Sequence, residues 1–329
     1  MSREKNLIER NISGLEPAVS GTIFHIPHDR LVELMRTDFK GFRVTSRKIE
    51  FDTDFHAADM RWNHMDFAHR PAIHGLYENG LRIAMGQDVC MGISPWPWTP
   101  ILIPTFDLRV SENEFRQILQ IAGVFTVVMR MSIVPIGPTG SAPRNIWRIE
   151  WSIASKWYFR FLHRLLHSKI EKLNRRLFDE DAAIKAARSS LRRRGFNFKN
   201  ADVDYRESSV LHPRNVERPA APALQIRTES LAPNARKVVK SGEREFVAAG
   251  EADGSFVVWD AVCGHQGGPL NDACREGDFL RCPWHGLKVA GAAVSRKQAS
   301  AETPAFSVEL GEKTMTITPH AGAEGNAAV

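Results

Sequence analysis

Two short segments in the C-terminal part of the chain each place a cysteine close to a histidine. The first is CGH at residues 263–265 and the second is CPWH at residues 282–285, with sixteen residues between them. Two ligands on each of two loops can hold opposite ends of one small metal centre, and thiolate and imidazole groups suit zinc and iron-sulfur clusters. The small residues around them let backbone amides approach cluster sulfurs. This spacing predicts a metal-binding domain built on two loops.

The rest of the cysteine content agrees with a metal site. The chain of 329 residues has four cysteines, too few and too scattered for a disulfide framework. The sequence has no run of about 18 apolar residues, which is the length that a membrane-spanning helix needs. The start MSREKNLIER lacks the apolar core of a signal peptide. We therefore expect a soluble, cytoplasmic protein with no membrane partner.

The charge of the chain is basic, with a formal net charge of +6 and a pI near 9.2. The aromatic residues are mostly Trp and Phe inside apolar runs, and they do not interleave with the basic residues as nucleic-acid recognition requires. We therefore expect no nucleic-acid partner. An acidic protein partner or an anionic substrate matches the charge at least as well.

A change of composition divides the chain in two. The segment HPRNVERPAAPAL at residues 212–224 is rich in proline and alanine and has no periodicity, which is typical of an exposed linker. We predict a first domain at 1–215, a linker at 216–223, a second domain at 224–318 and a flexible tail at 319–329.

Patterns of apolar residues predict an α+β fold class. The runs ILIPTFDLRV, VFTVVMRMSIVPI and NIWRIEWSIAS are strand-like, and the turn-rich GPTGSAPR between the last two favours an antiparallel meander. Helical spacing follows from Ser152 to Phe178, and a second helix is predicted from FDED to Gly195 because acidic residues and glycine suit its two ends. After the linker, short strands broken by turns predict a small all-β domain.

The first predicted helix has two distinct sides. Its apolar side comprises Tyr158, Leu162, Leu165, Leu166, Ile170, Leu173 and Leu177. His163, His167 and Glu171 are spaced by four residues and therefore share another side. These three could bind a metal ion, but they fall on the polar flank among arginines, where a solvated or interface role is more usual.

The two loops resemble the motif of Rieske [2Fe-2S] domains, which is C-x-H followed by C-P-W-H-G. The resemblance implies that Cys263 and Cys282 hold one iron. It implies that His265 and His285 hold the other. Zinc with two cysteines and two histidines is the alternative that the residue types leave open.

One subclass of Rieske protein is excluded within this resemblance. Rieske proteins of respiratory and photosynthetic complexes usually carry an extra cysteine in each loop, and Gly268 and Trp284 stand at these positions here. The domain is therefore similar to the oxygenase and ferredoxin type. Because a Rieske cluster only transfers electrons, the function depends on what receives them.

The first domain contains a second metal-binding pattern in RWNHMDFAHRPAIHG, with the spacing N-x2-D-x2-H-x4-H. Two imidazoles and one carboxylate on one face bind Fe(II) and leave open positions. The segment resembles the iron-binding signature of Rieske non-haem iron oxygenases. This implies that His69 and His74 are iron ligands and that Asp66 bridges towards a Rieske histidine of a neighbouring subunit. Asn63 matches a residue beside the iron.

The third iron ligand should be a carboxylate on a later helix. FDEDAAIKAARSSLRRRG resembles the family segment that supplies it, which favours Asp181. Asp179 and Glu180 remain alternatives, because acidic residues also stabilise the start of a helix. The family normally places the Rieske domain first, whereas the iron motif precedes it here, and an exposed linker makes this order tolerable.

The resemblance implies a Rieske non-haem iron mono- or dioxygenase with a helix-grip, START-like catalytic domain, a [2Fe-2S] cluster and Fe(II). Such an oxidoreductase uses O2 to hydroxylate, demethylate or N-oxidise a small aromatic or hydrophobic substrate, and it forms a homo-oligomer, usually a trimer. No G-x-G-x-x-G loop follows a strand, so electrons from NAD(P)H require an external reductase or ferredoxin. The alternative is a Rieske ferredoxin-like electron-transfer protein fused to a non-catalytic domain that binds a hydrophobic ligand.

Overall fold

The structure is a computed structural model in which the described residues form two compact units, Met1–Lys185 and Ala186–Val329. The described residues are 16–17, 24–25, 27–38, 40–66, 73–74, 81–85, 89–95, 102–136, 144–198 and 215–320. The predicted linker at 216–223 lies within the second unit, and the predicted domain extents stay a prediction. His69 and residues 321–329 lie outside the described residues.

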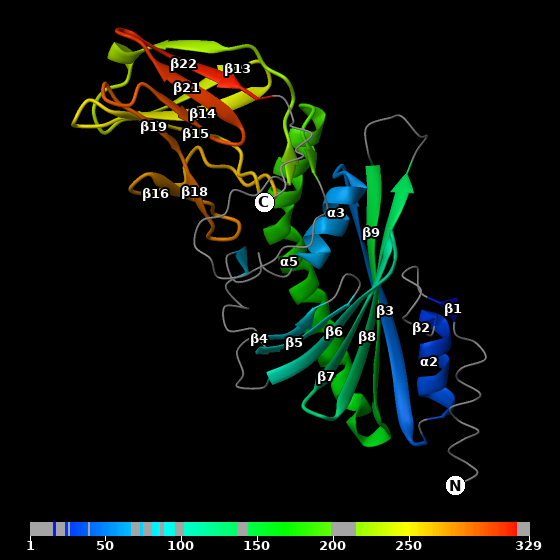
Figure 1. The fold of residues 1–329 in the computed structure, drawn as a ribbon. Helices are drawn as coiled ribbons and strands as arrows, with labels where there is room; N and C mark the ends of the chain where they lie inside the picture. Colours follow the sequence, from blue (N-terminus) through cyan, green and yellow to red (C-terminus); the bar gives the residue numbers. More distant parts are fainter. Residues whose placement is uncertain are drawn as a thin grey trace. The chain divides into compact units, whose positions relative to one another are not determined.

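The first unit is built on a seven-stranded antiparallel sheet with the order β3-β9-β8-β7-β6-β5-β4 (Figure 1). Its strands are β3 (Phe42–Thr53), β4 (Leu81–Met85), β5 (Val89–Pro95), β6 (Leu102–Ser111), β7 (Glu114–Ile121), β8 (Phe125–Ile136) and β9 (Arg144–Lys156). The three strand-like runs correspond to β6, β8 and β9. The predicted pairing of the last two is confirmed, from Thr126 opposite Ala154 to Ile136 opposite Arg144.

The helices of the first unit differ from those predicted. They are α2 (His28–Thr37), α3 (Ala57–Met65), the 3-10 helix η1 (Trp157–Leu162) and α5 (His163–Arg193), and a short pair joins β1 (Glu16–Pro17) to β2 (Phe24–His25). The helix predicted from Ser152 is wrong at its start, because residues 152–156 complete β9. The prediction of two helices is also wrong, because α5 is one helix of 31 residues.

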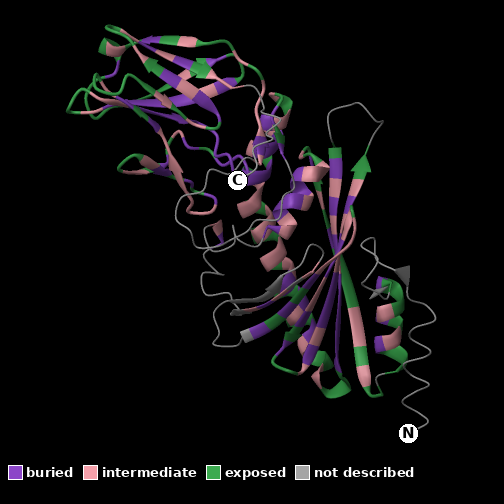
Figure 2. Cartoon of the chain, viewed as in Figure 1, coloured by how far each residue is buried: buried purple, intermediate pink, exposed green. Residues whose placement is uncertain are grey.

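The core of the first unit lies between α5 and the sheet. Alternate residues of β8 and β9 point into it, and Phe115, Val127, Trp151 and Ile153 are fully buried (Figure 2). Ile170 of α5 and Met60 of α3 belong to the same cluster. In a smaller cluster, Val32 and Met35 of α2 pack with the sheet residues Val128 of β8 and Ala154 of β9. This helix-plus-sheet arrangement confirms the α+β, helix-grip prediction.

The apolar side predicted for the first helix is partly wrong. Tyr158 and Leu165 are more than half exposed, whereas His163 and His167 are 2% and 3% exposed and face the sheet. The solvated role predicted for these histidines is therefore wrong, because the hydroxyl groups of Thr45 and Ser155 and the indole N–H of Trp151 hydrogen-bond to their ring nitrogens. Glu171 instead pairs with Arg175, at 2.9 Å.

The second unit is all-β beyond the end of α5, as predicted. Its elements are β10 (Asn197–Phe198), β11 (Val216–Glu217), β12 (Leu224–Arg227), the 3-10 helix η2 (Thr228–Ser230), β13 (Arg236–Ser241), β14 (Arg244–Gly250), β15 (Phe256–Asp260), β16 (Cys274–Glu276), β17 (Phe279–Arg281), β18 (Lys288–Ala290), β19 (Ala292–Val294), β20 (Ser300–Glu302), β21 (Phe306–Leu310) and β22 (Thr314–Pro319). Two four-stranded sheets, β12-β22-β21-β20 and β13-β14-β15-β19, contribute to a buried core that includes Phe246, Val258 and Met315. A three-stranded sheet, β16-β17-β18, carries the second metal loop.

Candidate metal sites

The two loops of the second unit have the same backbone hydrogen bonds. The N–H group of Cys263 donates to the carbonyl of Gly268 at 2.8 Å, and that of Cys282 donates to Leu287 at 2.8 Å. Each cysteine carbonyl also accepts from the residue four positions later, Gly267 in one loop and Gly286 in the other. Both of these glycines have positive φ angles, 88° and 69°, which side chains rarely tolerate. The two loops thus present their cysteines in the same way.

The structure brings the four predicted cluster ligands together. The thiol groups of Cys263 and Cys282 hydrogen-bond each other, and His285 hydrogen-bonds Cys282. The Nδ1 atoms of His265 and His285 are 3.3 Å apart. Two nitrogens that share one tetrahedral metal ion, each about 2.1 Å away, lie about 3.4 Å apart, so this pair is placed to share one iron.

The two cysteines also differ in protonation when no metal is bound. Their shared hydrogen bond lowers the pKa of Cys282 to about 5, with further hydrogen bonds from His285 and the Trp284 backbone. The same hydrogen bond, together with burial, raises the pKa of Cys263 well above its ordinary value. The pair therefore holds one thiolate and one proton near neutral pH, and a metal that binds both sulfurs displaces that proton.

Gly268 has no room for a side chain. A Cβ atom added there would lie 2.6 Å from the Sγ atom of Cys282 and 3.2 Å from the Trp284 ring. Neither neighbour can move easily, because Cys282 and Trp284 are 1% and 5% exposed. Cys263 and Cys282 are both free of disulfide bonds.

We expect Gly268→Ala to reduce cluster occupancy at least several-fold, because the added methyl group displaces the Cys282 sulfur. Iron content and visible absorption of the purified protein would measure this. Gly311→Ala is the matched control, since its Cβ atom would meet nothing closer than 3.4 Å. Equal iron content in the two variants would contradict the argument.

A buried arginine from the end of α5 supports the first loop. Arg188 is 0% exposed, and its Nη1 atom donates to the side-chain oxygen of Gln266 at 2.5 Å and to its carbonyl at 3.2 Å. The guanidinium also lies 4.1 Å from the centre of the Phe198 ring. Gln266 directly follows His265, so Arg188 fixes the backbone beside a predicted ligand. The sequence gives no signal for this contact, which spans 78 positions.

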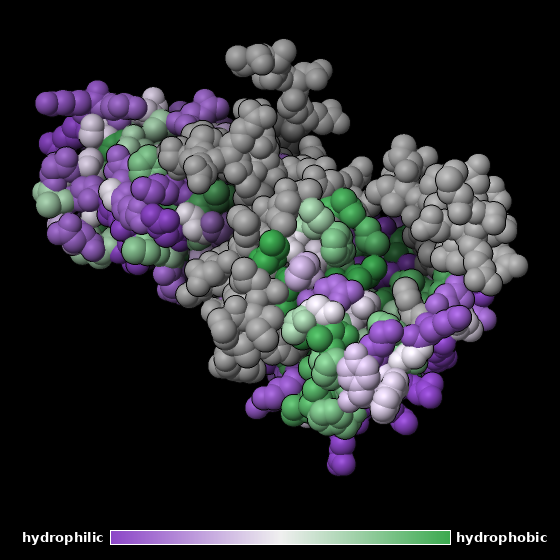
Figure 3. All heavy atoms as spheres, turned by 90° about the horizontal axis from the view of Figure 1, so that it is seen from below, coloured by the Kyte–Doolittle hydropathy of each residue, from purple (hydrophilic) through white to green (hydrophobic). Residues whose placement is uncertain are grey.

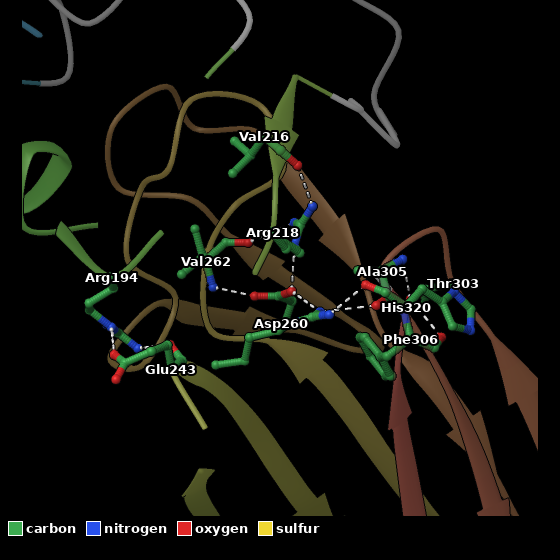
Figure 4. Close-up of polar contacts among 11 residues, drawn as sticks. Arg194, Val216, Arg218, Glu243, Asp260, Val262, Thr303, Ala305, Phe306 and His320 are labelled. Atoms are coloured by element: carbon green, nitrogen blue, oxygen red, sulfur yellow. Dashed lines mark hydrogen bonds and ion pairs between the residues drawn. The ribbon is translucent and has the colours of Figure 1, made fainter. Parts of the chain in front are cut away.

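A second support comes from the Asp260 network, which consists of Asp260, Arg244 and Arg218 (Figure 4). Arg218 and Arg244 both donate to Oδ2 of Asp260, at 2.6 and 3.0 Å. The other oxygen accepts from the N–H group of Val262 at 2.8 Å, directly before Cys263. Arg244 also donates to the carbonyls of Ala305 and His320. The end of β15 is thereby tied to the neighbouring strands.

In the first unit, the structure places His74 between two carboxylates of α5. Its Nδ1 atom is 2.8 Å from Oε2 of Glu180, and its Nε2 atom is 3.0 Å from Oδ1 of Asp181. The ring is 3% exposed. Arg176 donates to the other oxygen of Glu180 at 2.6 Å, while Asp179 is exposed. The favoured residue, Asp181, and the alternative Glu180 therefore contact His74 through different ring nitrogens.

The remaining predicted site residues of the first unit lie at the end of α3. Asn63 and Asp66 are 5% and 6% exposed, and the Asp66 backbone N–H closes the helix on the Trp62 carbonyl at 2.8 Å. The Nδ2 atom of Asn63 is buried and has no hydrogen-bond partner among the described residues. Among all the described residues of the chain, which do not include His69, no three His, Cys, Asp or Glu side chains surround a single metal position.

A buried lysine lies one turn beyond Asp181. Lys185 is 5% exposed, and its Nζ atom is 4.4 Å from the centre of the Phe178 ring. Burial lowers its pKa to about 8, and the charges of Asp181 and Asp179 partly oppose this effect. Water is therefore excluded from the region around Asp181 to a degree that disfavours the charged form of Lys185.

Comparison with known proteins identifies the second unit. A family model described as "Rieske [2Fe-2S] domain" matches residues 222–308. Norcoclaurine synthase from Thalictrum flavum aligns at 14% identity over 38% of this chain and 84% of its own, with a TM-score of 0.32. A START superfamily protein from Mycobacterium smegmatis aligns at 15% identity over 43% and 98%, with a TM-score of 0.33. No curated protein matches.

The fold and the matched domain together define the class of the chain. It joins a helix-and-sheet unit to a Rieske domain, whose ligand is a [2Fe-2S] cluster. No helix in the described parts is long and apolar enough to cross a membrane.

Proposed function

We propose that this protein is a Rieske-type non-haem iron oxygenase that oxidises a small hydrophobic or aromatic substrate. The observation that carries the proposal is the buried His74 ring, held between Glu180 and Asp181 in the unit that accompanies the Rieske domain. The proposal requires two metal centres in one chain. One would transfer electrons and the other would support the reaction with O2.

The Rieske centre would use the four side chains gathered on the two loops. Cys263 and Cys282 would bind one iron, and His265 and His285 the other. His265 is 1% exposed, whereas His285 is partly exposed. An external reductase or ferredoxin would therefore deliver electrons, derived from NAD(P)H, on the His285 side of the cluster.

The Fe(II) centre would use His74, Asp181 and His69. Two ligand atoms about 2.1 Å from one octahedral ion and at right angles to each other lie about 3.0 Å apart. The 3.0 Å between Nε2 of His74 and Oδ1 of Asp181 matches this separation. A metal-binding histidine usually donates its other ring N–H to a carboxylate, and Glu180 accepts at Nδ1. This assigns Asp181 as ligand and Glu180 as the residue that orients the ring.

The other predicted residues would act around this centre. Asp66 would bridge towards a Rieske histidine of a neighbouring subunit in a homotrimer, and the buried amide of Asn63 would lie beside the iron. The iron supplies O2 activation when bound. His74, Asp181 and His69 would hold it by one face, which leaves positions for O2 and substrate.

One observation also suits the alternative function. A distance of 3.0 Å between His74 and Asp181 is that of an ordinary hydrogen bond, so the contact can exist without iron. The first unit would then bind a hydrophobic ligand without catalysis, and the Rieske domain would serve electron transfer alone.

The deciding experiment is electron paramagnetic resonance of anaerobic protein after reduction and addition of nitric oxide. We expect wild type to show a Rieske signal and a high-spin iron-nitrosyl signal. Asp181→Ala and His74→Ala should keep the first and lose the second, because each removes one ligand. Asp179→Ala is the matched control, since this neighbouring carboxylate is exposed and should leave both signals intact. A Rieske signal without any nitrosyl signal in wild type would favour the electron carrier.

A further inference from the structure

Four exposed apolar side chains gather where β9 passes into α5. Trp157, Tyr158, Phe161 and Leu165 are 65%, 51%, 76% and 56% exposed, and we call them the apolar patch. They belong to η1 and the first turn of α5. Among the described residues only three other large apolar side chains are exposed, Phe106 at 39%, Ile136 at 37% and Val238 at 42%, and they lie at separate positions. Large apolar groups clustered on a surface mark an interaction site.

Basic residues interleave with the apolar patch. Residues 151–170 contain no aspartate or glutamate, and Lys156, Arg160, Arg164 and Lys169 are all exposed between or beside the patch residues. The Lys156 ammonium donates to the carbonyl of Lys40, another exposed cation, at 3.2 Å. Figure 3, which views the molecule from the end at which α5 begins, shows apolar and hydrophilic residues side by side on this face.

The neighbouring turn of the sheet adds no negative charge. Ala122 and Gly123, between β7 and β8, are exposed and uncharged. They lie at the same end as the patch, because the Phe125 ring that follows them contacts Phe159 of η1 at 5.8 Å. Asp38, the acidic residue before β3, is exposed here and accepts a hydrogen bond from Thr37, but Lys40, Lys156, Arg160 and Arg164 outnumber it. This end of the first unit is therefore both apolar and mostly basic.

We propose that this end of the first unit docks on a membrane surface that contains anionic phospholipids. Tryptophan and tyrosine favour the interface between headgroups and acyl chains, where Phe161 and Leu165 would insert less polar groups. The flanking lysines and arginines would extend to lipid phosphates. The protein would then lie on the membrane without crossing it. This departs from the expectation of no membrane partner, which rested on the lack of a spanning segment.

Sedimentation with lipid vesicles tests the proposal on the full-length protein. We expect binding to vesicles of phosphatidylcholine mixed with phosphatidylglycerol, and at least about tenfold weaker binding to pure phosphatidylcholine. Phe161→Ser combined with Leu165→Ser should weaken binding to the mixed vesicles about tenfold or more. Val238→Ser is the control, because Val238 is an exposed apolar residue of the second unit. High salt should weaken wild-type binding, because the lysines and arginines contribute through charge.

Three outcomes would overturn the proposal. The first is no binding of wild type to anionic vesicles. The second is equal binding by wild type and the Phe161/Leu165 double variant. The third is patch-dependent association without lipid, seen by sedimentation velocity as self-association or as a complex with an acidic ferredoxin, in place of vesicle binding. Unchanged circular dichroism of the double variant would show that the exposed substitutions leave the fold intact.

Discussion

Replacing Asp260 by alanine should destabilise the Rieske domain by about 3–5 kcal/mol, because it removes the carboxylate from a buried ion network. Arg244 is 1% exposed and Arg218 is 11% exposed at the side chain. Both guanidinium groups would lose their shared anion while remaining buried. The Val262 N–H group would lose its acceptor next to Cys263. We therefore expect lower occupancy of the [2Fe-2S] cluster and more frequent local unfolding of β14 and β15.

Amide hydrogen exchange of β14 and β15 would measure this loss within the second unit alone. Asp272→Ala is the matched control, since Asp272 is an exposed aspartate of the same domain. Asp260→Asn should have a smaller effect, because its side-chain oxygen still accepts hydrogen bonds while the charge is lost. Exchange rates in Asp260→Ala equal to those in the control would contradict the network's role.

The local part of the Rieske site could be predicted from the sequence, but its support could not. Cys263 and His265 are two residues apart, so their spacing alone indicates a metal loop. Arg188 contacts Gln266 from 78 positions away, and Arg244 reaches Ala305 from 61 positions away. Nothing in the local pattern distinguishes these arginines from the exposed ones. Only the folded sheets show which cations are buried.

The first unit shows a different limit of sequence reasoning. Acidic residues around Asp181 favour the start of a helix, yet they lie in the middle of α5. Their role depends on His74, which is 106 positions from Glu180. The strand β7 was missed because Arg116 and Gln117 interrupt its apolar residues. Arg116 is in fact 2% exposed.

The buried histidines of α5 form a chain of hydrogen bonds with one direction. The indole N–H of Trp151 can only donate, so Nδ1 of His167 accepts it, at 2.8 Å. Nε2 of His167 then carries the proton and donates to Thr45, whose hydroxyl donates to Nδ1 of His163. Nε2 of His163 donates to Ser155. Both rings are therefore fixed in the neutral state.

Acid should consequently destabilise the first unit well before its carboxylates are all protonated. Burial, helped by the charge of Arg47, lowers the pKa of His167 to about 4, and burial also lowers the pKa of His163. Above the unfolded pKa of 6.5 the folded and unfolded chains bind equal numbers of protons at these rings. As pH falls below 6.5, only the unfolded chain gains protons, so the free energy of unfolding falls.

We expect His167 alone to remove about 2 kcal/mol of stability between neutral pH and pH 5 and about 3 kcal/mol by pH 4, and the loss levels off only below the folded pKa, at about 3.4 kcal/mol. Urea unfolding at pH 7 and 5, followed by the helical circular dichroism signal, would measure this change. In His167→Gln the dependence on pH should be weaker by that amount, since the amide can still accept from Trp151 and donate to Thr45 without gaining a proton. His56→Asn, which replaces an exposed histidine and keeps an acceptor at the start of α3, should retain the wild-type dependence. The same slope in His167→Gln and wild type would show that the chain of hydrogen bonds tolerates a protonated ring.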